Sequence, residues 1–232
     1  MKNLIRAIYQ AVIKPVLLRI REGITPTPKE KVINLCVQFA SQCNLEGDYW
    51  EFGVFRGDSF IAAYKFAQNL PRLKEMRFVA FDSFEGLPEL TKEDSNIHVF
   101  KKAEYRYGLE EFKIRLNING INLNSVDLIP GWFDKSLTKE TYKEHSLRFP
   151  AVAMIDCDLY SSTKSVLKFL TDYVLQGTVL IFDDWFTYRN SSKEGEIRAV
   201  NEWLSENPQI TLTEYYKYSY HGISFIVNIE DN

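Results

Sequence analysis

The sequence predicts an α/β domain of the doubly wound, Rossmann-like class, with a mostly parallel sheet and a C-terminal antiparallel hairpin. Three observations indicate this fold. Short apolar runs alternate with helix-length amphipathic segments, acidic residues directly follow several of these runs, and the last two strand-like runs are nearly adjacent. Adjacent strands pair antiparallel, whereas strands separated by a helix pair in parallel. The chain has 232 residues, 45% of them hydrophobic and 25% charged, which is typical of one globular domain.

The first half of the chain reads as helix, strand, helix and strand. Pro26 and Pro28 mark a turn, and Thr27 can cap the helix that follows, because a threonine hydroxyl accepts hydrogen bonds from free N–H groups. Residues 83–107 are polar and aromatic with little periodicity, and the segment is long enough to form a lid over a site. The elements expected here are a helix at 29–43, a strand at 48–53, a helix at 58–69 and a strand at 76–81.

The second half continues the alternation and then changes. Gly177 is expected to end a helix that lies between two buried strands. The last two strands have no helix between them, so they should form the antiparallel hairpin. The expected elements are a helix at 109–118, strands at 125–129, 151–155 and 178–182, a helix at 193–206, and the hairpin strands at 209–216 and 222–227.

The N-terminal residues form a separate basic segment. Residues 1–21 contain five basic residues and no acidic one, and their apolar residues recur at helical spacing. The longest uncharged stretch, 7–13, is too short for a signal-peptide core or a membrane span. We expect this helix to dock on its own domain or on the second subunit of a homodimer, with an anionic membrane surface as the weaker alternative. A helical segment at 1–44, acting as lid or dimer contact, is therefore separated from a main domain at 45–232.

Charge and cysteine content exclude several classes of protein. The formal net charge of −3 gives no basic surface of the kind that binds nucleic acid, so no nucleic-acid partner is expected. Cys36, Cys43 and Cys157 are too few and too scattered for a disulfide framework or a thiolate zinc site. Such cysteine usage fits a reducing compartment, so we expect a cytoplasmic protein.

Acidic residues gather where the last two parallel strands end. Asp156 and Asp158 follow one strand, and Asp183 and Asp184 follow the next. Ligands of open parallel sheets bind outside these strand ends, so the carboxylates should face one spot. Two carboxylates about 4 Å apart repel by about 4 kcal/mol at an effective dielectric near 20, and a cation or a shared proton relieves this. An all-oxygen site favours Mg²⁺, with Mn²⁺ or Ca²⁺ as substitutes, over zinc. Alternation turns Cys157 toward the core. Two solvated strand-end loops are the alternative.

A glycine-containing turn follows the first expected strand and suits a nucleotide-like cofactor. Gly53 and Gly57 let the backbone pass close to a ligand and present free N–H groups. Asp82, at the end of the next strand, is placed to accept hydrogen bonds from ribose hydroxyls. The third glycine of a dinucleotide fingerprint is missing, and Glu51 and Asp58 would repel a phosphate. These features favour S-adenosylmethionine (SAM), whose head is cationic, over NAD.

Taken in order, these motifs resemble the macrocin O-methyltransferase (TylF/MycF-type) family of SAM- and Mg²⁺-dependent sugar O-methyltransferases. The resemblance covers roughly residues 45–190 and implies the class I methyltransferase form of the predicted fold. The N-terminal helices and the terminal strands match none of its motifs. The motifs that carry it are Glu51-x-Gly53-Val54-x-x-Gly57-x-Ser59, Phe81-Asp82-Ser83-Phe84-Glu85-Gly86-Leu87-Pro88, Gly131-Trp132-Phe133, Asp156-x-Asp158-Leu159-Tyr160-x-Ser162-Thr163 and Asp183-Asp184-Trp185.

The resemblance implies a role for each matched residue. Asp156, Asp183 and Asp184 would hold magnesium, and Asp158 would be the general base beside the acceptor hydroxyl. The residues themselves leave His221 open as a second base, because the pKa of its imidazole is better matched to proton transfer near neutral pH. The implied SAM site consists of Glu51, Gly53, Gly57, Ser59, Asp82, Ser83, Gly131 and Trp132, the last two near adenine.

Several readings of the reaction remain open at the level of sequence. The resemblance implies methylation of a sugar hydroxyl on a glycosylated natural product, a nucleotide sugar or a glycan. A metal-dependent glycosyltransferase is the strongest alternative, because Asp156-Cys157-Asp158 also fits the Asp-x-Asp pattern that holds Mn²⁺ and a nucleotide-sugar diphosphate. A catechol-type O-methyltransferase acting on a phenol and a non-enzymatic SAM-binding protein are the other readings.

Overall fold

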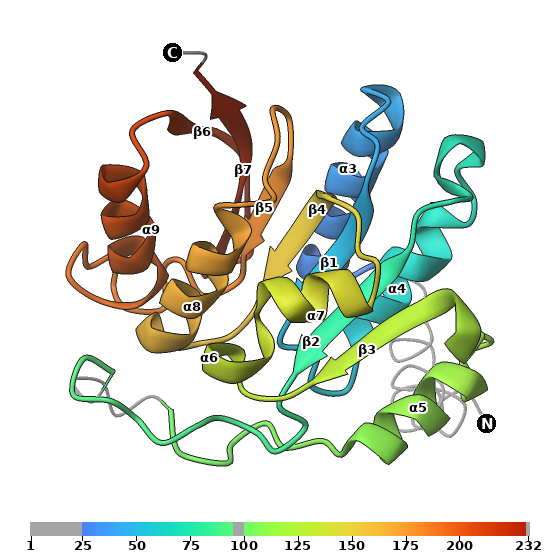
Figure 1. Ribbon diagram of the computed structural model, residues 1–232, viewed down its shortest axis with the longest axis horizontal. Coiled ribbons are helices and arrows are strands. Elements are labelled where there is room, and N and C mark those ends of the chain that lie inside the picture. Colours follow the sequence, from blue (N-terminus) through green and yellow to red (C-terminus); the bar gives the residue numbers. More distant parts are fainter. Residues whose placement is uncertain (1–24, 95–99, 231–232) are drawn as a thin grey trace, which may run out of the picture.

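A seven-stranded sheet with helices on both faces forms the protein in a computed structural model, which describes residues 25–94 and 100–230 (Figure 1). The strand order is β3-β2-β1-β4-β5-β7-β6. The first five strands in this order are parallel, whereas β7 pairs antiparallel with both β5 and β6. The predicted doubly wound fold and its C-terminal hairpin are therefore confirmed. The predicted amphipathic helix at 1–21 lies outside the described residues.

The elements lie close to their predicted positions, except that the helix expected to end at Gly177 already ends at Leu170. The strands are β1 (Asp48–Phe52), β2 (Phe78–Asp82), β3 (Val126–Pro130), β4 (Pro150–Ile155), β5 (Val179–Phe182), β6 (Ile210–Tyr218) and β7 (Gly222–Ile229). The α-helices are α3 (Pro28–Gln42), α4 (Asp58–Ala67), α5 (Leu109–Ile118), α6 (Phe133–Ser136), α7 (Lys139–Glu144), α8 (Tyr160–Leu170) and α9 (Gly195–Glu206). Two short 3₁₀ helices are η2 (Pro71–Leu73) and η3 (Leu123–Ser125). Helices α6 and α7 were not expected, since four and six residues are too few to show helical periodicity.

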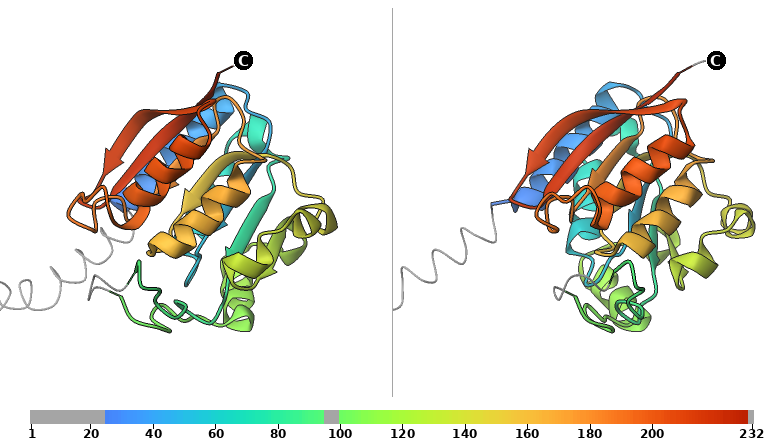
Figure 2. Two further views of the ribbon diagram at one scale, coloured as in Figure 1. Left: turned by 60° about the vertical axis from the view of Figure 1, so that its left-hand side comes forward. Right: turned by 90° about the vertical axis from the view of Figure 1, so that its left-hand side faces the viewer.

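Two hydrophobic cores lie on opposite faces of the sheet. Helices α3, α4 and α5 pack on one face, and α8 and α9 pack on the other (Figure 2). Alternation along β1 serves both faces, because Tyr49 belongs to the first core and the next residue, Trp50, belongs to the second. Helix α3 falls within the segment predicted at 1–44 and contributes Val32, Ile33 and Cys36 to the first core. The role of that segment as lid or dimer contact stays a prediction.

Helix α3 has a well-defined start that matters for the site. Thr27 caps it as expected, and its hydroxyl accepts a hydrogen bond from the backbone N–H of Glu30 at 3.2 Å. Glu30 completes a capping box, and Pro28 stands in the first turn, where its missing N–H costs nothing. The first turn of α3 is thereby fixed, and with it the starting point of the Lys29 side chain.

The strand order reverses between β1 and β4. In an open α/β sheet, ligands bind in the crevice outside the carboxyl ends of the strands at such a reversal. The turns after β1, β2, β4 and β5 therefore lie at the same edge of the sheet (Figure 1). Among the described residues, no helix is both long and apolar enough to cross a membrane.

Candidate active site

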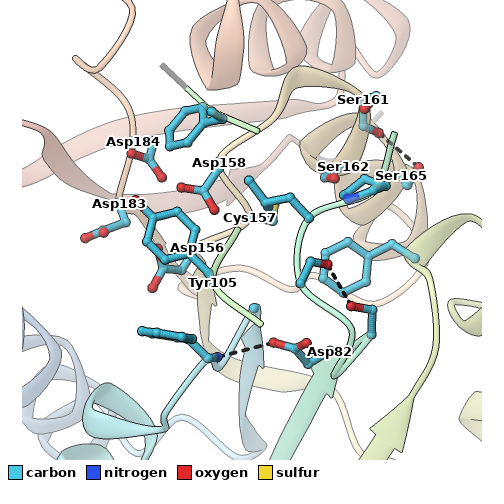
Figure 3. Close-up of a pocket in the computed structure, with 18 of the residues that line it drawn as sticks. Asp82, Tyr105, Asp156, Cys157, Asp158, Ser161, Ser162, Ser165, Asp183 and Asp184 are labelled. Atoms are coloured by element: carbon cyan, nitrogen blue, oxygen red, sulfur yellow. Dashed lines mark hydrogen bonds between the residues drawn. The ribbon is translucent and has the colours of Figure 1, made fainter. Parts of the chain in front are cut away.

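A cavity of about 1060 Å³ lies at the carboxyl ends of the parallel strands. Residues 83–94 and 100–107, from the segment predicted as a lid, form part of its wall, and Asp94 ties them to α8 by accepting a hydrogen bond from Ser161 N at 3.1 Å. Figure 3 shows the acidic residues at one side of the cavity and Asp82 at another. Of the predicted site residues, Gly53, Asp82, Ser83, Gly131, Trp132, Asp156, Asp158, Asp183 and Asp184 line it.

Three carboxylates converge at the ends of β4 and β5. One oxygen from each of Asp156, Asp183 and Asp184 lies within 4.8 Å of the others. Burial raises the pKa of the Asp156 carboxyl, and the neighbouring Asp183 raises it further. Burial raises the pKa of Asp184 as well, followed in weight by the charge of Asp156. The fold thus holds three carboxylates close together in a largely buried site, where a cation or a proton is needed to balance their negative charge.

Neighbouring side chains fix the direction of these carboxylates. The hydroxyl of Tyr218, from β6, donates to Oδ1 of Asp183 at 2.7 Å. Thr187 donates its hydroxyl proton to Oδ1 of Asp184 at 2.8 Å. The Nδ1 of His221 lies 2.6 Å from the backbone oxygen of Asp183, which places the ring proton of neutral His221 on Nδ1 and leaves Nε2 as an acceptor. Partners of this kind set the orientation of metal-binding carboxylates.

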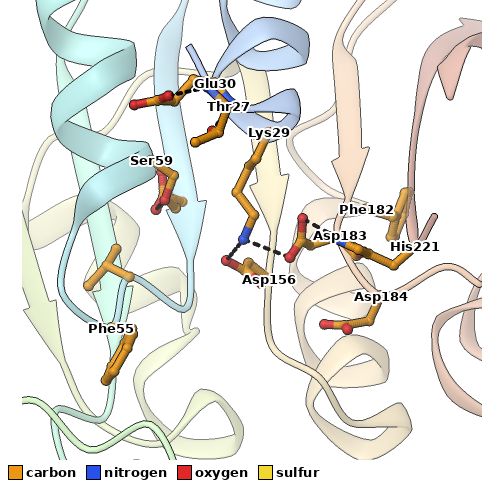
Figure 4. Close-up of polar contacts among 12 residues, drawn as sticks. Thr27, Lys29, Glu30, Phe55, Ser59, Asp156, Phe182, Asp183, Asp184 and His221 are labelled. Carbon is orange, nitrogen blue, oxygen red and sulfur yellow. Dashed lines mark hydrogen bonds and ion pairs between the residues drawn. The ribbon is translucent and has the colours of Figure 1, made fainter. Parts of the chain in front are cut away.

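A cation from the protein itself stands among the carboxylates. The Nζ of Lys29, from α3, lies 2.9 Å from Oδ2 of Asp156 and 2.6 Å from Oδ2 of Asp183 (Figure 4). Burial alone lowers the pKa of the Lys29 ammonium, but the charges of Asp156 and Asp183 outweigh it, so the pKa lies above its ordinary value. A positively charged group is thus accommodated between Asp156 and Asp183. An all-oxygen donor set around such a position fits a hard ion such as Mg²⁺.

Asp158 lies beside the cluster and makes a different set of contacts. Its φ of +61° is in the left-handed region, unusual for a residue with a side chain, and Tyr188 holds this turn by donating to the Asp158 backbone oxygen at 2.6 Å. Figure 3 shows its carboxylate on the cavity side, directed toward Asp183 and Asp184. Burial, and next the charge of Asp184, raises the pKa of Asp158 well above the ordinary value for aspartate. A raised pKa makes this carboxylate a stronger base.

The other end of the cavity is built around Asp82. Its Oδ2 accepts hydrogen bonds from the backbone N–H of Val54 at 2.8 Å and of Phe55 at 3.3 Å, and its Oδ1 accepts one from Phe84 at 2.7 Å. These bonds tie the glycine turn after β1 to the turn after β2. Gly53 has a φ of +85°, and a Cβ there would lie 1.9 Å from the backbone oxygen of Asp156, so only glycine fits.

Three of the predicted SAM residues lie behind the cavity wall. Glu51 is fully buried and accepts hydrogen bonds from Tyr49 and Ser59, both at 2.6 Å. Burial raises the pKa of Glu51 to about 8, although both hydrogen bonds oppose the shift. Burial therefore disfavours the negatively charged form of Glu51. Gly57 and Ser59 also lie outside the described lining of the cavity. Their predicted contact with SAM stays a prediction.

Sequence reasoning missed four residues at this site. Lys29 and Tyr218 reach the carboxylates from distant elements, and no local motif marks them. Thr187 lies three residues after Asp184, a spacing that allows a local hydrogen bond, so its role was detectable. Glu196, on α9, is fully buried, and neither of its carboxyl oxygens has a hydrogen-bond partner within the described parts of the chain. Burial raises its pKa well above the ordinary value, and the charge of Asp184 adds to this.

The chain matches proteins of known function along most of its length. A family model described as macrocin-O-methyltransferase (TylF) matches residues 23–207. Mycinamicin III 3''-O-methyltransferase of Micromonospora griseorubida is 29% identical over 161 residues, which are 65% of this chain and 59% of that protein. The 8-demethyl-8-(2,3-dimethoxy-alpha-L-rhamnosyl)-tetracenomycin-C 4'-O-methyltransferase of Streptomyces olivaceus is 28% identical over 158 residues, which are 66% of this chain and 58% of that protein. The chain thus spans 58–59% of the length of these curated relatives.

Solved structures show the same fold. The structure of the O-methyltransferase NovP is similar with a TM-score of 0.72 at 22% sequence identity, covering 86% of this chain and 79% of NovP. At this level of identity the likeness shows the arrangement of strands and helices.

Proposed function

We propose, from the premise that the chain belongs to the macrocin O-methyltransferase (TylF) family, that it transfers a methyl group from SAM to a sugar hydroxyl with the help of Mg²⁺. The observation that carries this proposal is the convergence of Asp156, Asp183 and Asp184 around a cation position. The same cavity contains Asp158 and, at another side, Asp82 with the glycine turn. The proposed metal ligands, the proposed base and several of the proposed cofactor-binding residues thus line one cavity.

The residues divide the chemistry between them. When bound, SAM supplies a methyl group on a cationic sulfur, and Mg²⁺ orients an acceptor hydroxyl and lowers its pKa. Asp156, Asp183 and Asp184 would hold the ion, and Asp158 would take the hydroxyl proton, for which its raised pKa suits it. The acceptor oxygen gains the methyl group as the bond between that group and the sulfur breaks. His221, with Nε2 free to accept, stays the second candidate for the base.

Asp82 and the turns around it would hold the cofactor. Gly53 lines the same cavity, and Asp82 is placed at the strand end where ribose hydroxyls are commonly bound. Gly131 and Trp132 lie on the same wall, where the indole ring can stack on adenine. The backbone N–H groups that Asp82 already binds hold its carboxylate in place.

A sugar-bearing natural product is the proposed class of acceptor. The name of the relative from Streptomyces olivaceus describes a substrate that contains a rhamnosyl group. In this chain Phe55, Tyr105 and Tyr220 are partly or largely exposed at the cavity, where aromatic rings can stack on a sugar. A cytoplasmic location and a homodimer remain part of the proposal, and light scattering of the full chain tests the latter.

Calorimetric titration with SAM and, separately, with a UDP-sugar tests the reaction class. SAM binding without UDP-sugar binding is the expected result. Tight UDP-sugar binding without SAM binding would instead establish the glycosyltransferase reading. The acceptor is then identified by mass analysis of products from a panel of glycosylated compounds, with a catechol included as the competing type of acceptor.

A further inference from the structure

Lys29 lies between two carboxylates of the acidic cluster, although nothing in its sequence surroundings marks it as part of the site. Its ammonium contacts two of the three carboxylates that are proposed to hold magnesium, at 2.9 Å from Asp156 and 2.6 Å from Asp183. Its side chain is 29% exposed, whereas those of Asp156 and Asp183 are 21% and 10% exposed. These are partly buried ion pairs, which solvent screens less than it screens pairs on an open surface.

The ammonium and a metal ion would use the same oxygen atoms. Mg²⁺ binds carboxylate oxygens at about 2.0–2.1 Å, so an ion held by Oδ2 of Asp183 would lie less than about 5 Å from Nζ in its present position. A dication and an ammonium at such a separation repel each other, and each oxygen would have to serve both. Metal binding therefore disfavours the ion pairs of Lys29 with Asp156 and Asp183, and these ion pairs disfavour metal binding.

The Lys29 side chain has a route out of the cluster. The capping box of Thr27 and Glu30 fixes the backbone at the start of α3, so displacement needs only rotation of the flexible four-carbon side chain. Lys29 lines the cavity, which offers space for the released ammonium. Helix α3 can thus stay packed on the sheet while its lysine changes position.

We propose that Lys29 is a tethered cation that neutralises the acidic cluster in the metal-free protein and competes with Mg²⁺ for it. This inference rests on the proposed metal site. Lys29 keeps the cluster folded before a metal arrives and sets the metal concentration at which the site fills. Loading the metal then releases a positive charge into the cavity that receives the acceptor.

Metal affinity tests this competition directly. Lys29→Met keeps the length of the side chain and removes its charge, and Lys31→Met is the matched control, because Lys31 is exposed on the same helix. Titration of the full chain with Mn²⁺, followed by electron paramagnetic resonance, should show binding about ten- to a hundredfold tighter in Lys29→Met than in the wild type or the control. Equal or weaker binding in Lys29→Met overturns the competition while the metal site itself stands. Absence of Mn²⁺ binding in every variant overturns both the competition and the magnesium part of the proposed function.

A second measurement uses the unaltered protein and so does not depend on folding of a variant. Acetic anhydride labelling with mass spectrometry reports how accessible each lysine is. Saturating Mg²⁺ should raise labelling of Lys29 several-fold and leave that of Lys31 unchanged. Unchanged or reduced labelling of Lys29, under conditions where metal binding is measured, contradicts release of the ammonium.

Discussion

Tyr218 offers a sharp test of how the proposed metal site is built, because it acts without touching the metal. Tyr218 is 4% exposed, and its hydroxyl donates to Oδ1 of Asp183 at 2.7 Å and lies 3.3 Å from the backbone oxygen of Phe182. Tyr218→Phe keeps the ring and removes only the donor. The orientation of the Asp183 carboxylate would then depend on its remaining contacts.

The size of the effect follows from this hydrogen bond. A hydrogen bond to a charged group contributes about 1.5–3 kcal/mol, and removal of a partner that orients a metal ligand lowers metal affinity about ten- to a hundredfold. We therefore expect Mg²⁺ affinity to fall by that factor in Tyr218→Phe. SAM affinity should change little, since the Asp82 end of the cavity has none of these contacts.

Calorimetric titration with Mg²⁺ and with SAM measures both quantities on the same samples. Tyr216→Phe is the matched control, because Tyr216 is on the same strand and is 50% exposed. Wild-type Mg²⁺ affinity in Tyr218→Phe, with a native fold by circular dichroism, would show that Tyr218 does not orient a metal ligand. A parallel loss of SAM affinity would indicate a general structural effect instead.

Two further predictions concern Asp158 and Glu196. Asp158→Asn should slow methyl transfer by about 10²–10⁴-fold with Mg²⁺ and SAM still bound, as measured by single-turnover kinetics. An unchanged rate would assign the base to another residue, and His221 would be the next candidate. Burial raises the pKa of Glu196, so the folded protein retains a proton on this carboxyl that the unfolded chain releases above about pH 4.5. The contribution of Glu196 to the free energy of unfolding is therefore full at acid pH and declines as the pH rises, by up to about 1.4 kcal/mol per pH unit. Glu196→Gln should remove this decline. In denaturant unfolding from about pH 5 to 8, the stability of Glu196→Gln relative to the wild type should therefore increase with pH. A stability difference between the two proteins that stays constant with pH contradicts this prediction.

The position of the acidic residues at the strand ends was predictable from sequence, because short apolar runs mark the strands. Asp156, Asp183 and Asp184 directly follow apolar runs, and in a parallel sheet that position alone brings them to one edge. The glycine turn and Asp82 were found by the same rule. The alternation of helices and strands predicts parallel strands whose carboxyl ends share one edge, whereas the strand order that joins the two ends in one cavity is seen only in the structure.

The contacts that neutralise and orient the carboxylates were not predictable. Lys29 lies 127 residues before Asp156, and Tyr218 lies 35 residues after Asp183, on an antiparallel strand whose register is set by tertiary packing. The burial of the Glu51 carboxyl was also not predictable from sequence. Strand β1 is buried on both faces, so no alternation in the sequence shows that this carboxyl points into the protein.

We propose that methyl transfer from SAM to a sugar hydroxyl requires a cation held by the three aspartates. The most direct measurement is transfer of a labelled methyl group from SAM to a glycosylated acceptor, with Mg²⁺ or with excess EDTA, in the wild type and in Asp183→Ala. We predict a labelled sugar only in the wild type with Mg²⁺, with SAM binding retained in Asp183→Ala. Full transfer in EDTA, or by Asp183→Ala, would contradict the account.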